Sequence, residues 1–248
     1  MSPVFDCTTP EGVADALPKV VDGVREGKLV VLPTDTVYGI GSDAFSVEAV
    51  RALLAAKGRG REMPPPVLIA EARTVDGLAT DVPAFAQALI ERFWPGPLTL
   101  VLQAQPSLMW DLGETEGTVA LRMPDDEVAL AILRAVGPMA VSSANRTGHP
   151  ASRTVLDAAA QLGAAVTFYL DGGTARGGLA STIVDCTGGE PVVLREGALS
   201  EADIRAVTDP LLAQPGPDQP LELAAEPAAP EASTSSPTSD SQEKPRDE

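Results

Sequence analysis

The chain has 248 residues, of which 44% are hydrophobic and only 4% aromatic, so it can form one large domain or two small ones. It contains no apolar run of the roughly 18 residues that a transmembrane helix needs, and its first residues do not resemble a signal peptide, which predicts a cytoplasmic protein without a membrane span. The net charge of −17 disfavours a broad nucleic-acid surface, because such a surface repels phosphate unless basic residues gather in one place.

Cysteine and histidine usage narrows the chemistry further. Cys7 and Cys186 lie far apart in the sequence without a metal-like spacing, so both are expected to be reduced thiols. The single histidine, His149, leaves little room for a histidine-rich metal site or a histidine-based catalytic triad.

The first predicted elements lead to a polar segment that follows a buried strand. Thr8 and Glu11 have the spacing of a capping box, which predicts a helix that is bent or broken near Pro18. The apolar residues 29–32 predict a buried strand, and residues 33–41, PTDTVYGIG, follow it. Polar groups at a strand end bind ligands in many α/β proteins, whereas the simpler interpretation is a strand and a turn with two glycines.

A second helix is predicted from its N-cap Ser46 to Gly58, and a basic segment follows it. Lys57-Gly58-Arg59-Gly60-Arg61 places three cations in five residues, the densest positive charge in the chain. Three prolines and a predicted strand at 67–70 come next. Glycines between cations let backbone amides and side chains converge on phosphate, although a solvated basic loop has the same composition.

In the middle of the chain, a helix is predicted at 83–94 and a rigid turn at 94–97. A strand at 98–102, an irregular loop at 105–117 and a strand at 118–123 are predicted next. Alternation in the last strand places Thr118, Ala120 and Arg122 on one face. An arginine at a strand end can hold a carboxylate through two hydrogen bonds, and a surface arginine is the alternative interpretation.

A predicted helix at 124–136 and a short strand at 138–141 lead into a second polar strand end, Ser142-Ser143-Ala144-Asn145. Serine and asparagine here can bind phosphate oxygens or a small polar ligand, or they can satisfy one another in a turn. Ser152 is predicted to cap the helix that follows at 154–162.

The last elements predict a sheet of mixed strand direction. A strand at 167–170 precedes a hairpin formed by 181–185 and 191–195, and a final helix starts at Ser200 and ends before Pro210. Residues 214–248 then carry 8 acidic and 2 basic residues, which leaves a net charge of −11 on the first 213. We expect one α/β domain over 1–213 and a disordered acidic tail over 214–248.

Common nucleotide-binding and nucleophile motifs are missing. The sequence has no GxGxxG, GxxxxGK[ST], GxSxG or CxxC, so Rossmann, P-loop, esterase and redox functions lose their main support. Hydroxyls, an amide and cations at strand ends suit the positioning of a nucleotide and a carboxylate better than proton abstraction or acyl-enzyme chemistry.

Six segments, in this order and spacing, resemble the YrdC/TsaC-type threonylcarbamoyl-AMP synthases: PTDTVYGIG, KGRGREMPPP, FWPGPLTLVL, VALRMPD, SSANRTGHPAS and STIVDCTG…LREG. The resemblance covers residues 8–207 and implies the short, single-domain form, with a twisted open mixed α/β sheet and a positively charged cleft. It implies condensation of L-threonine, bicarbonate and ATP, with Mg²⁺, to L-threonylcarbamoyl-AMP and pyrophosphate. Other proteins then transfer the threonylcarbamoyl group to a tRNA adenosine beside the anticodon.

The same resemblance implies roles for individual residues. The predicted ATP-binding residues are Lys57, Arg59, Arg61, Thr118, Ser143, Asn145, Ser152 and Arg195, of which Lys57 and Arg59 are also the predicted catalytic residues. The predicted threonine-binding residues are Thr34, Tyr38, Arg122, Ser142, Ser181 and Thr182, with Arg122 as the clamp for the carboxylate. The metal ligands are left open, with Asp35 and Asp185 as candidates for an indirect contact to Mg²⁺.

Two positions depart from the family pattern. Met63 stands where the family commonly has lysine, and we hypothesise that Arg61 replaces the missing phosphate contact. Ser142 stands where relatives often have proline, so its role as a threonine ligand rests on this chain alone.

Two other functions are compatible with the same motifs. The first is a non-catalytic module that binds RNA or a nucleotide, which the acidic charge of residues 1–213 disfavours. The second is a ligase for another amino acid or carbamoyl donor, as in hydrogenase maturation, which usually comes with acylphosphatase and zinc-finger domains that this sequence lacks.

Overall fold

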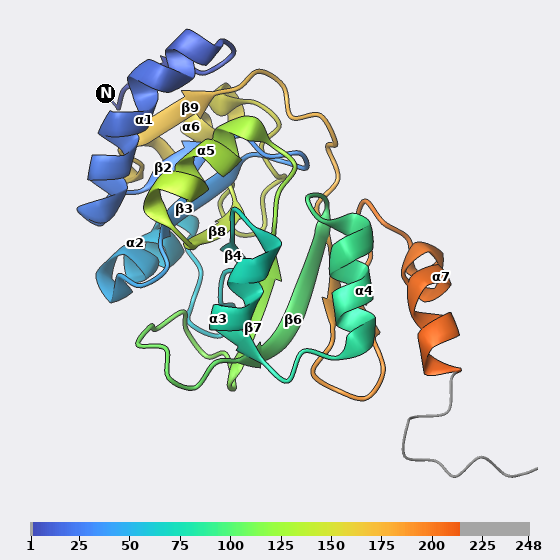
Figure 1. Ribbon diagram of the computed structural model, residues 1–248. Helices are drawn as coiled ribbons and strands as arrows, with labels where there is room; N and C mark the ends of the chain where they lie inside the picture. Colours follow the sequence, from blue (N-terminus) through green and yellow to red (C-terminus); the bar gives the residue numbers. More distant parts are fainter. Residues whose placement is uncertain (1, 214–248) are drawn as a thin grey trace, which may run out of the picture. The chain divides into compact units, whose positions relative to one another are not determined.

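The computed structural model describes residues 2–213, and the predicted acidic tail from Gln214 lies outside the described residues. One sheet of 11 strands forms the centre of the described part (Figure 1). The strands are β1 (Val4–Asp6), β2 (Val30–Leu32), β3 (Gly39–Asp43), β4 (Val67–Leu68), β5 (Ala79–Thr80), β6 (Leu98–Ala104), β7 (Thr118–Arg122), β8 (Met139–Ser143), β9 (Phe168–Asp171), β10 (Thr182–Asp185) and β11 (Val192–Arg195). The α-helices are α1 (Pro10–Arg25), α2 (Val47–Lys57), α3 (Val75–Leu78), α4 (Ala84–Phe93), α5 (Glu127–Val136), α6 (Val155–Leu162) and α7 (Glu201–Leu212).

The sheet mixes parallel and antiparallel neighbours, as the sequence predicts. Its strand order is β1-β9-β2-β3-β8-β4-β7-β6-β10-β11, and β5 pairs with β6. β4 runs parallel to β7, whereas β6 and β7 are antiparallel. The predicted hairpin is confirmed, because β10 and β11 pair antiparallel.

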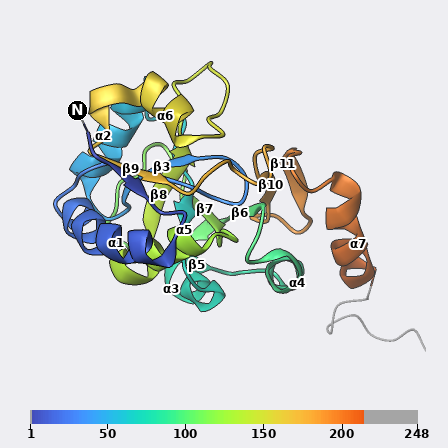
Figure 2. The ribbon, with the colours of Figure 1, turned by 90° about the horizontal axis from the view of Figure 1, so that it is seen from above.

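Helices cover both faces of the sheet. α1 and α5 pack on one face, where Val20 and Ile132 belong to one apolar cluster. α2 and α6 pack on the other face, where Leu53 and Ala158 belong to a second cluster. Figure 2 shows these two pairs of helices on opposite sides of the strands. The polar strand ends therefore emerge from a sheet that is fixed by apolar packing on both faces.

A third cluster fixes the strands that build the site. Leu98, Leu100 and Leu102 point from β6 into the cluster that also holds Phe85 and Leu89 of α4. Side chains of a strand alternate between its two faces, so the residues between these leucines point the other way. This opposite face of β6 and β7 is the one that lines the cavity described below.

The simpler interpretation of residues 33–41, a strand and a turn with two glycines, is wrong, because Gly39 and Gly41 belong to strand β3. β3 pairs antiparallel with β2 and with β8. A Cβ on Gly39 would lie 2.7 Å from Val141 Cγ1, and one on Gly41 would lie 3.1 Å from Met139 Cε. The glycines therefore serve close packing of β8 against β3. The polar residues 33–38 become the connection of a hairpin, held at both ends by strands.

Several predicted helix limits also need correction. The hydroxyl of Thr9, and not of Thr8, caps α1, and the helix continues through Pro18. Thr154 caps α6 in place of Ser152. α7 continues through Pro210, since a proline near a helix end removes one hydrogen bond that packing can outweigh.

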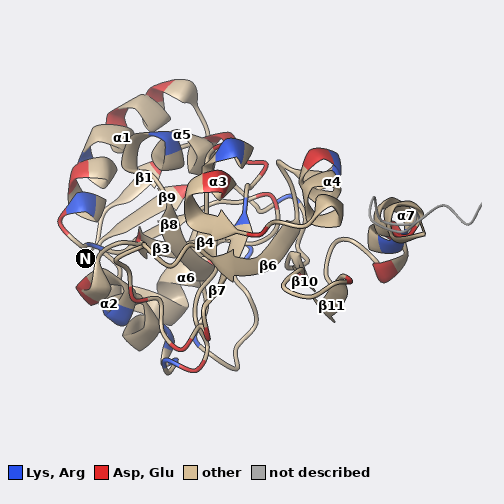
Figure 3. Cartoon of the chain, turned by 60° about the horizontal axis from the view of Figure 1, so that its bottom comes forward, with Lys and Arg blue, Asp and Glu red and all other residues tan. Residues whose placement is uncertain are grey.

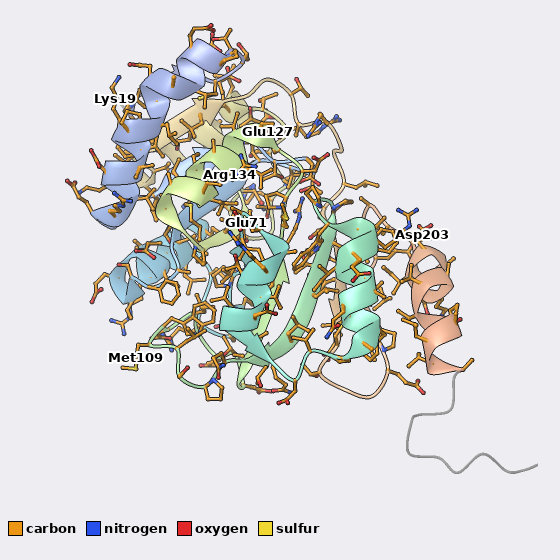
Figure 4. All side chains as sticks on the ribbon, viewed as in Figure 1. Lys19, Glu71, Met109, Glu127, Arg134 and Asp203 are labelled. Carbon is orange, nitrogen blue, oxygen red and sulfur yellow. The ribbon has the colours of Figure 1, made fainter. Side chains whose placement is uncertain are left out.

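Other helix limits are close to the prediction. Ser46 and Ser200 cap α2 and α7, and Asp203, labelled in Figure 4, completes a capping box. Asp126 caps α5, which begins at Glu127, a little after the predicted start.

The charges of the described residues are spread over the outer helices. Figure 3 shows acidic and basic residues interspersed along α1, α4 and α7. No helix among residues 2–213 is long and apolar enough to cross a membrane.

Candidate functional site

A cavity of about 370 Å³ opens on the face of β6 and β7 that points away from α4. Its walls come from the hairpin connection 33–38, from the segment 59–66, and from strands β6, β7, β8, β10 and β11. The structure brings nine of the predicted site residues to this cavity: Thr34, Tyr38, Arg59, Thr118, Arg122, Ser142, Ser143, Ser181 and Arg195. Residues from five motifs that are distant in the sequence thus line one cavity. Taken alone, each motif was also compatible with a turn, a loop or a surface residue.

Three further threonine hydroxyls line the cavity, and the sequence predicts no role for them. Thr36, Thr99 and Thr115 come from the hairpin connection, from β6 and from the loop before β7. Thr99 Oγ1 lies 2.9 Å from Ser181 Oγ. The alternation of β6, with leucines on its other face, was a signal that could have identified Thr99.

The charge of the cavity wall has one sign. Its ionisable residues other than Tyr38 are Arg59, Arg122 and Arg195, and no aspartate, glutamate or histidine lines it. Burial lowers the pKa of Arg195, and the nearby Arg59 lowers it further. In a chain with net charge −17, this wall is a local exception that suits anionic ligands.

Arg122, at the end of β7, is buried, with 6% of its surface exposed. Its Nε donates to Gly96 O at 3.0 Å, its Nη1 donates to Thr36 Oγ1 at 3.0 Å, and its Nη2 donates to Asp35 Oδ1. Each terminal nitrogen keeps one further N–H without a partner among the described residues. Two such groups match the two oxygens of a carboxylate.

The connection 33–38 is rigid because its side chains bond to its own backbone and to its neighbours. Thr34 Oγ1 donates to Val37 O at 2.6 Å and accepts from Thr36 N at 3.2 Å. The hydroxyl of Tyr38 donates to Gly173 O at 2.6 Å, and burial raises the pKa of this phenol to about 12. Tyr38 is fully buried in the apolar cluster beneath α2 and α6, and its hydroxyl anchors the connection to the loop after β9.

Arg59 and Arg195 line the part of the cavity next to the two serine motifs. Arg59 Nη1 donates to Ser142 Oγ at 3.2 Å, and its buried Nε has no partner within the described residues. Arg195 Nη2 donates to Ser181 O at 2.6 Å. Within residues 2–213 neither guanidinium has a carboxylate within 4.0 Å, so both charges are available to a ligand.

Lys57 does not line the cavity but holds the loop that does. Its side chain is buried, with 2% exposed, and its ammonium donates to the carbonyls of Ser143 and Asn145, the latter at 2.7 Å. Burial, and to a lesser extent the nearby Arg59, lowers the pKa of Lys57 to about 8. Lys57 thus fixes the backbone of the SSAN segment from beneath.

Three other predicted residues are also buried beneath the wall. Asn145 donates to the carbonyls of Arg146 and His149, and its Oδ1 has no partner among the described residues. Ser152 donates to Ala144 O. Thr182 donates to Leu199 O at 2.6 Å. Their present contacts shape the loops, and their predicted ligand contacts stay predictions.

Arg61 points away from the cavity toward the loop before β7. Its Nη1 and Nη2 donate to the two carboxylate oxygens of Asp111 at 2.9 and 2.8 Å. In addition, Glu114 N donates to Arg61 O at 2.8 Å. These contacts join the basic segment to residues 105–117, whose exposed tip is Met109, labelled in Figure 4. The hypothesis that Arg61 contacts phosphate therefore needs this ion pair to open.

The two aspartates that are candidates for an indirect contact to Mg²⁺ are each bonded to neighbouring groups through Oδ1, and that indirect contact stays a prediction. Asp35 Oδ1 accepts from Arg122 and from Asp125 N at 3.1 Å. Asp185 Oδ1 accepts from the backbone and hydroxyl of Thr187 at 2.9 and 2.7 Å. Neither lines the cavity, and residues 2–213 contain no group of three or more histidine, cysteine, aspartate or glutamate side chains that could hold a metal ion.

Comparison with known proteins agrees with this arrangement. The family model for Sua5, YciO and YrdC, described as "Telomere recombination", matches residues 22–197. The chain belongs to the Sua5/YciO/YrdC family. A Mycobacterium tuberculosis protein that is provisionally named a threonylcarbamoyl-AMP synthase is 52% identical over 207 residues, which cover 84% of this chain and 95% of that protein.

Longer members of the Sua5/YciO/YrdC family are also similar. The Bacillus subtilis threonylcarbamoyl-AMP synthase is 39% identical over 76% of this chain, and the match covers 55% of that protein. The crystal structure of Pyrococcus abyssi Sua5 in complex with L-threonine is 35% identical with a TM-score of 0.77, covering 83% of this chain and 61% of that one. The predicted YrdC-like fold is therefore confirmed, and the chain spans about three fifths of that Sua5 structure.

Proposed function

We propose that this protein condenses L-threonine, bicarbonate and ATP to L-threonylcarbamoyl-AMP and pyrophosphate. The observation that carries the proposal is the cavity wall, which combines three guanidinium groups with a belt of hydroxyls and has no carboxylate or imidazole. The family membership supports it, because the solved Sua5 relative binds L-threonine.

The reaction needs positioning and charge more than it needs a protein base. The amine of threonine and bicarbonate form a carbamate and water. A carbamate oxygen then attacks the α-phosphorus of ATP, and the bond to pyrophosphate breaks. Because both reactants are anions, the main barrier that the protein can lower is their repulsion and their wrong orientation. Arg59 and Arg195, which have no carboxylate partner among residues 2–213, supply that field, and Arg122 supplies directed N–H groups. The transfer of AMP to the carbamate makes the protein a nucleotidyltransferase in this proposal.

The two substrates find different partners in the cavity. The two free N–H groups of Arg122 suit the carboxylate of threonine. Arg59 and Arg195, which have no carboxylate partner among residues 2–213, suit the phosphates of ATP. The phosphate oxygens of ATP and water would hold Mg²⁺, which would neutralise part of the phosphate charge, as is usual for this ion.

The product is a reactive mixed anhydride that must be consumed soon after release. We propose that tRNA-modifying transferase proteins take it and place the threonylcarbamoyl group on adenosine. RNA binding by this chain itself is not part of the proposal, since the cavity is small and the first 213 residues are acidic.

One assay tests the proposed function. Pyrophosphate release from Mg-ATP should require both L-threonine and bicarbonate, and omission of either should reduce release to background. Release without threonine would indicate a different acceptor. No release under any condition, together with retained RNA binding, would favour the non-catalytic module.

A matched pair of variants tests the role of Arg61. If Arg61 leaves Asp111 to contact ATP, Arg61→Ala should raise the KM for ATP about tenfold, the effect of one lost charged hydrogen bond. Asp111→Ala should then leave the KM for ATP unchanged or lower it, because it frees Arg61. Equal increases in both variants would instead show that the ion pair matters through the loop 105–117. Steady-state kinetics at fixed, saturating threonine distinguishes the two outcomes.

A further inference from the structure

Arg122 differs from the other two arginines that line the cavity in having a carboxylate partner. The Asp35 carboxylate lies against Arg122 Nη2, and the two side chains are 10% and 7% exposed. Lys57 bonds to backbone carbonyls, while Arg59 and Arg195 bond to serine hydroxyl and carbonyl groups. Among residues 2–213, the positive charge of the cavity wall is therefore neutralised at Arg122 and left without a carboxylate partner at Arg59 and Arg195.

Asp35 is held firmly in this place. Its Oδ1 also accepts from Asp125 N at 3.1 Å, and its carbonyl accepts from Gly177 N at 3.0 Å. A Cβ on Gly177 would lie 2.6 Å from Asp35 O, so the segment after β9 crosses the hairpin connection closely. Asp35 does not line the cavity, and its effect on a ligand passes through Arg122.

The charge distribution divides the cavity into two ends. The guanidinium of Arg122 with Asp35 has no net charge, while Arg59 and Arg195 keep theirs. An amino acid carries a carboxylate and an ammonium group and has no net charge, whereas ATP and pyrophosphate carry several negative charges. A neutral end with two directed N–H groups suits the first ligand, and a positive end suits the second.

We propose that Asp35 is a specificity-determining residue that neutralises Arg122, so that this end of the cavity accepts a zwitterionic amino acid and rejects phosphate groups. The inference rests on the proposed function and deepens it. A buried guanidinium without Asp35 would attract any phosphate, and the ATP substrate and pyrophosphate product would then occupy the amino acid end. Specificity here comes from a carboxylate that weakens the binding of the wrong anion.

Inhibition by inorganic phosphate tests the proposal. In the wild-type protein, phosphate should compete with ATP and not with L-threonine. In Asp35→Asn, which keeps an acceptor oxygen but removes the charge, phosphate should also compete with threonine. In Asp35→Asn, phosphate should raise the KM for threonine at a concentration about tenfold or more below one that leaves the wild-type KM for threonine unchanged, because a unit charge at hydrogen-bond distance in a buried site is removed. A general loss of structure would weaken the binding of both substrates and would not make phosphate compete with threonine.

Two control variants separate charge from position. Asp125→Asn removes a neighbouring exposed carboxylate that lies 3.8 Å from Arg176, and phosphate should still not compete with threonine. Thr36→Val removes a neutral acceptor from the same guanidinium, so it should weaken threonine use without creating phosphate competition.

A binding measurement removes the dependence on turnover. By calorimetry, threonine should displace phosphate from Asp35→Asn, whereas threonine and phosphate should bind the wild-type protein independently. The inference would be overturned if phosphate displaced threonine from the wild-type protein. It would also be overturned if threonine and phosphate did not displace each other in a folded Asp35→Asn protein. If the wild-type protein neither binds threonine nor releases pyrophosphate with it, the proposed function itself fails.

Discussion

Replacing Arg122 by lysine should raise the KM for L-threonine about a hundredfold and change the KM for ATP by less than about threefold. Lysine keeps the charge but loses the planar fork, which at this position donates to Gly96, Thr36 and Asp35 and keeps two N–H groups for a ligand. Two charged hydrogen bonds to a carboxylate are worth about 3 kcal/mol together, which corresponds to the hundredfold change.

The matched control for Arg122→Lys is Arg195→Lys. Both arginines line the cavity and both have a pKa lowered first by burial, but Arg195 has no carboxylate partner within residues 2–213. Arg195→Lys should therefore raise the KM for ATP and leave that for threonine nearly unchanged. Steady-state kinetics with each substrate varied in turn measures this crossover. Equal losses for both substrates in Arg122→Lys would mean that Arg122 acts on the fold and does not bind threonine.

Much of the fold follows from local patterns, because buried strands and capped helices are specified within a few residues. The caps of Ser46 and Ser200 and the hairpin β10–β11 are examples. The interpretation of Gly39 and Gly41 as turn residues fails for a non-local reason. Two glycines near a polar segment favour a turn, but here the side chains of β8 require the space that a Cβ would fill. That requirement comes from a strand about a hundred residues later in the sequence.

The site was predictable as a set of motifs and not as a set of contacts. The motifs named nine residues that line the cavity, since polar residues at strand ends meet on one face of a sheet. Asp35 stands within one of these motifs, yet its pairing with Arg122 joins positions 87 residues apart. Likewise, the composition of the basic segment gives no sign that Lys57 is buried while Arg61 is paired at the surface. Burial and pairing depend on which strands are neighbours, and no local pattern specifies that.

Lys57→Met should lower kcat/KM for ATP about a hundredfold although Lys57 does not line the cavity. The ammonium donates to the carbonyls of Ser143 and Asn145, and both bonds are lost in the variant. Because two charged hydrogen bonds together contribute about 3 kcal/mol, the SSAN backbone should lose its fixed position against Arg59. The effect on the KM for threonine should be smaller, since Arg122 keeps its own partners.

The same variant tests the burial of this charge through the pH dependence of stability. Burial, and to a lesser extent Arg59, lowers the pKa of Lys57 from 10.5 to about 8, so between these values the unfolded chain binds more protons than the folded protein. The free energy of unfolding contributed by Lys57 should therefore rise with pH in this window, by about 3 kcal/mol at most. Urea unfolding of the wild-type protein and Lys57→Met at pH 7 and pH 10 measures the difference.

Comparing the wild-type protein with Lys57→Met cancels the contributions to stability of other groups that titrate in the same pH range. Burial raises the pKa of Cys186 to about 12 and that of Tyr169 to about 12, and such groups lower stability as the pH rises past their unfolded values. These contributions are common to both proteins, so only Lys57 distinguishes them. If the stability difference between wild type and Lys57→Met is the same at both pH values, Lys57 is not a buried charge in solution. The SSAN loop must then be held by another group.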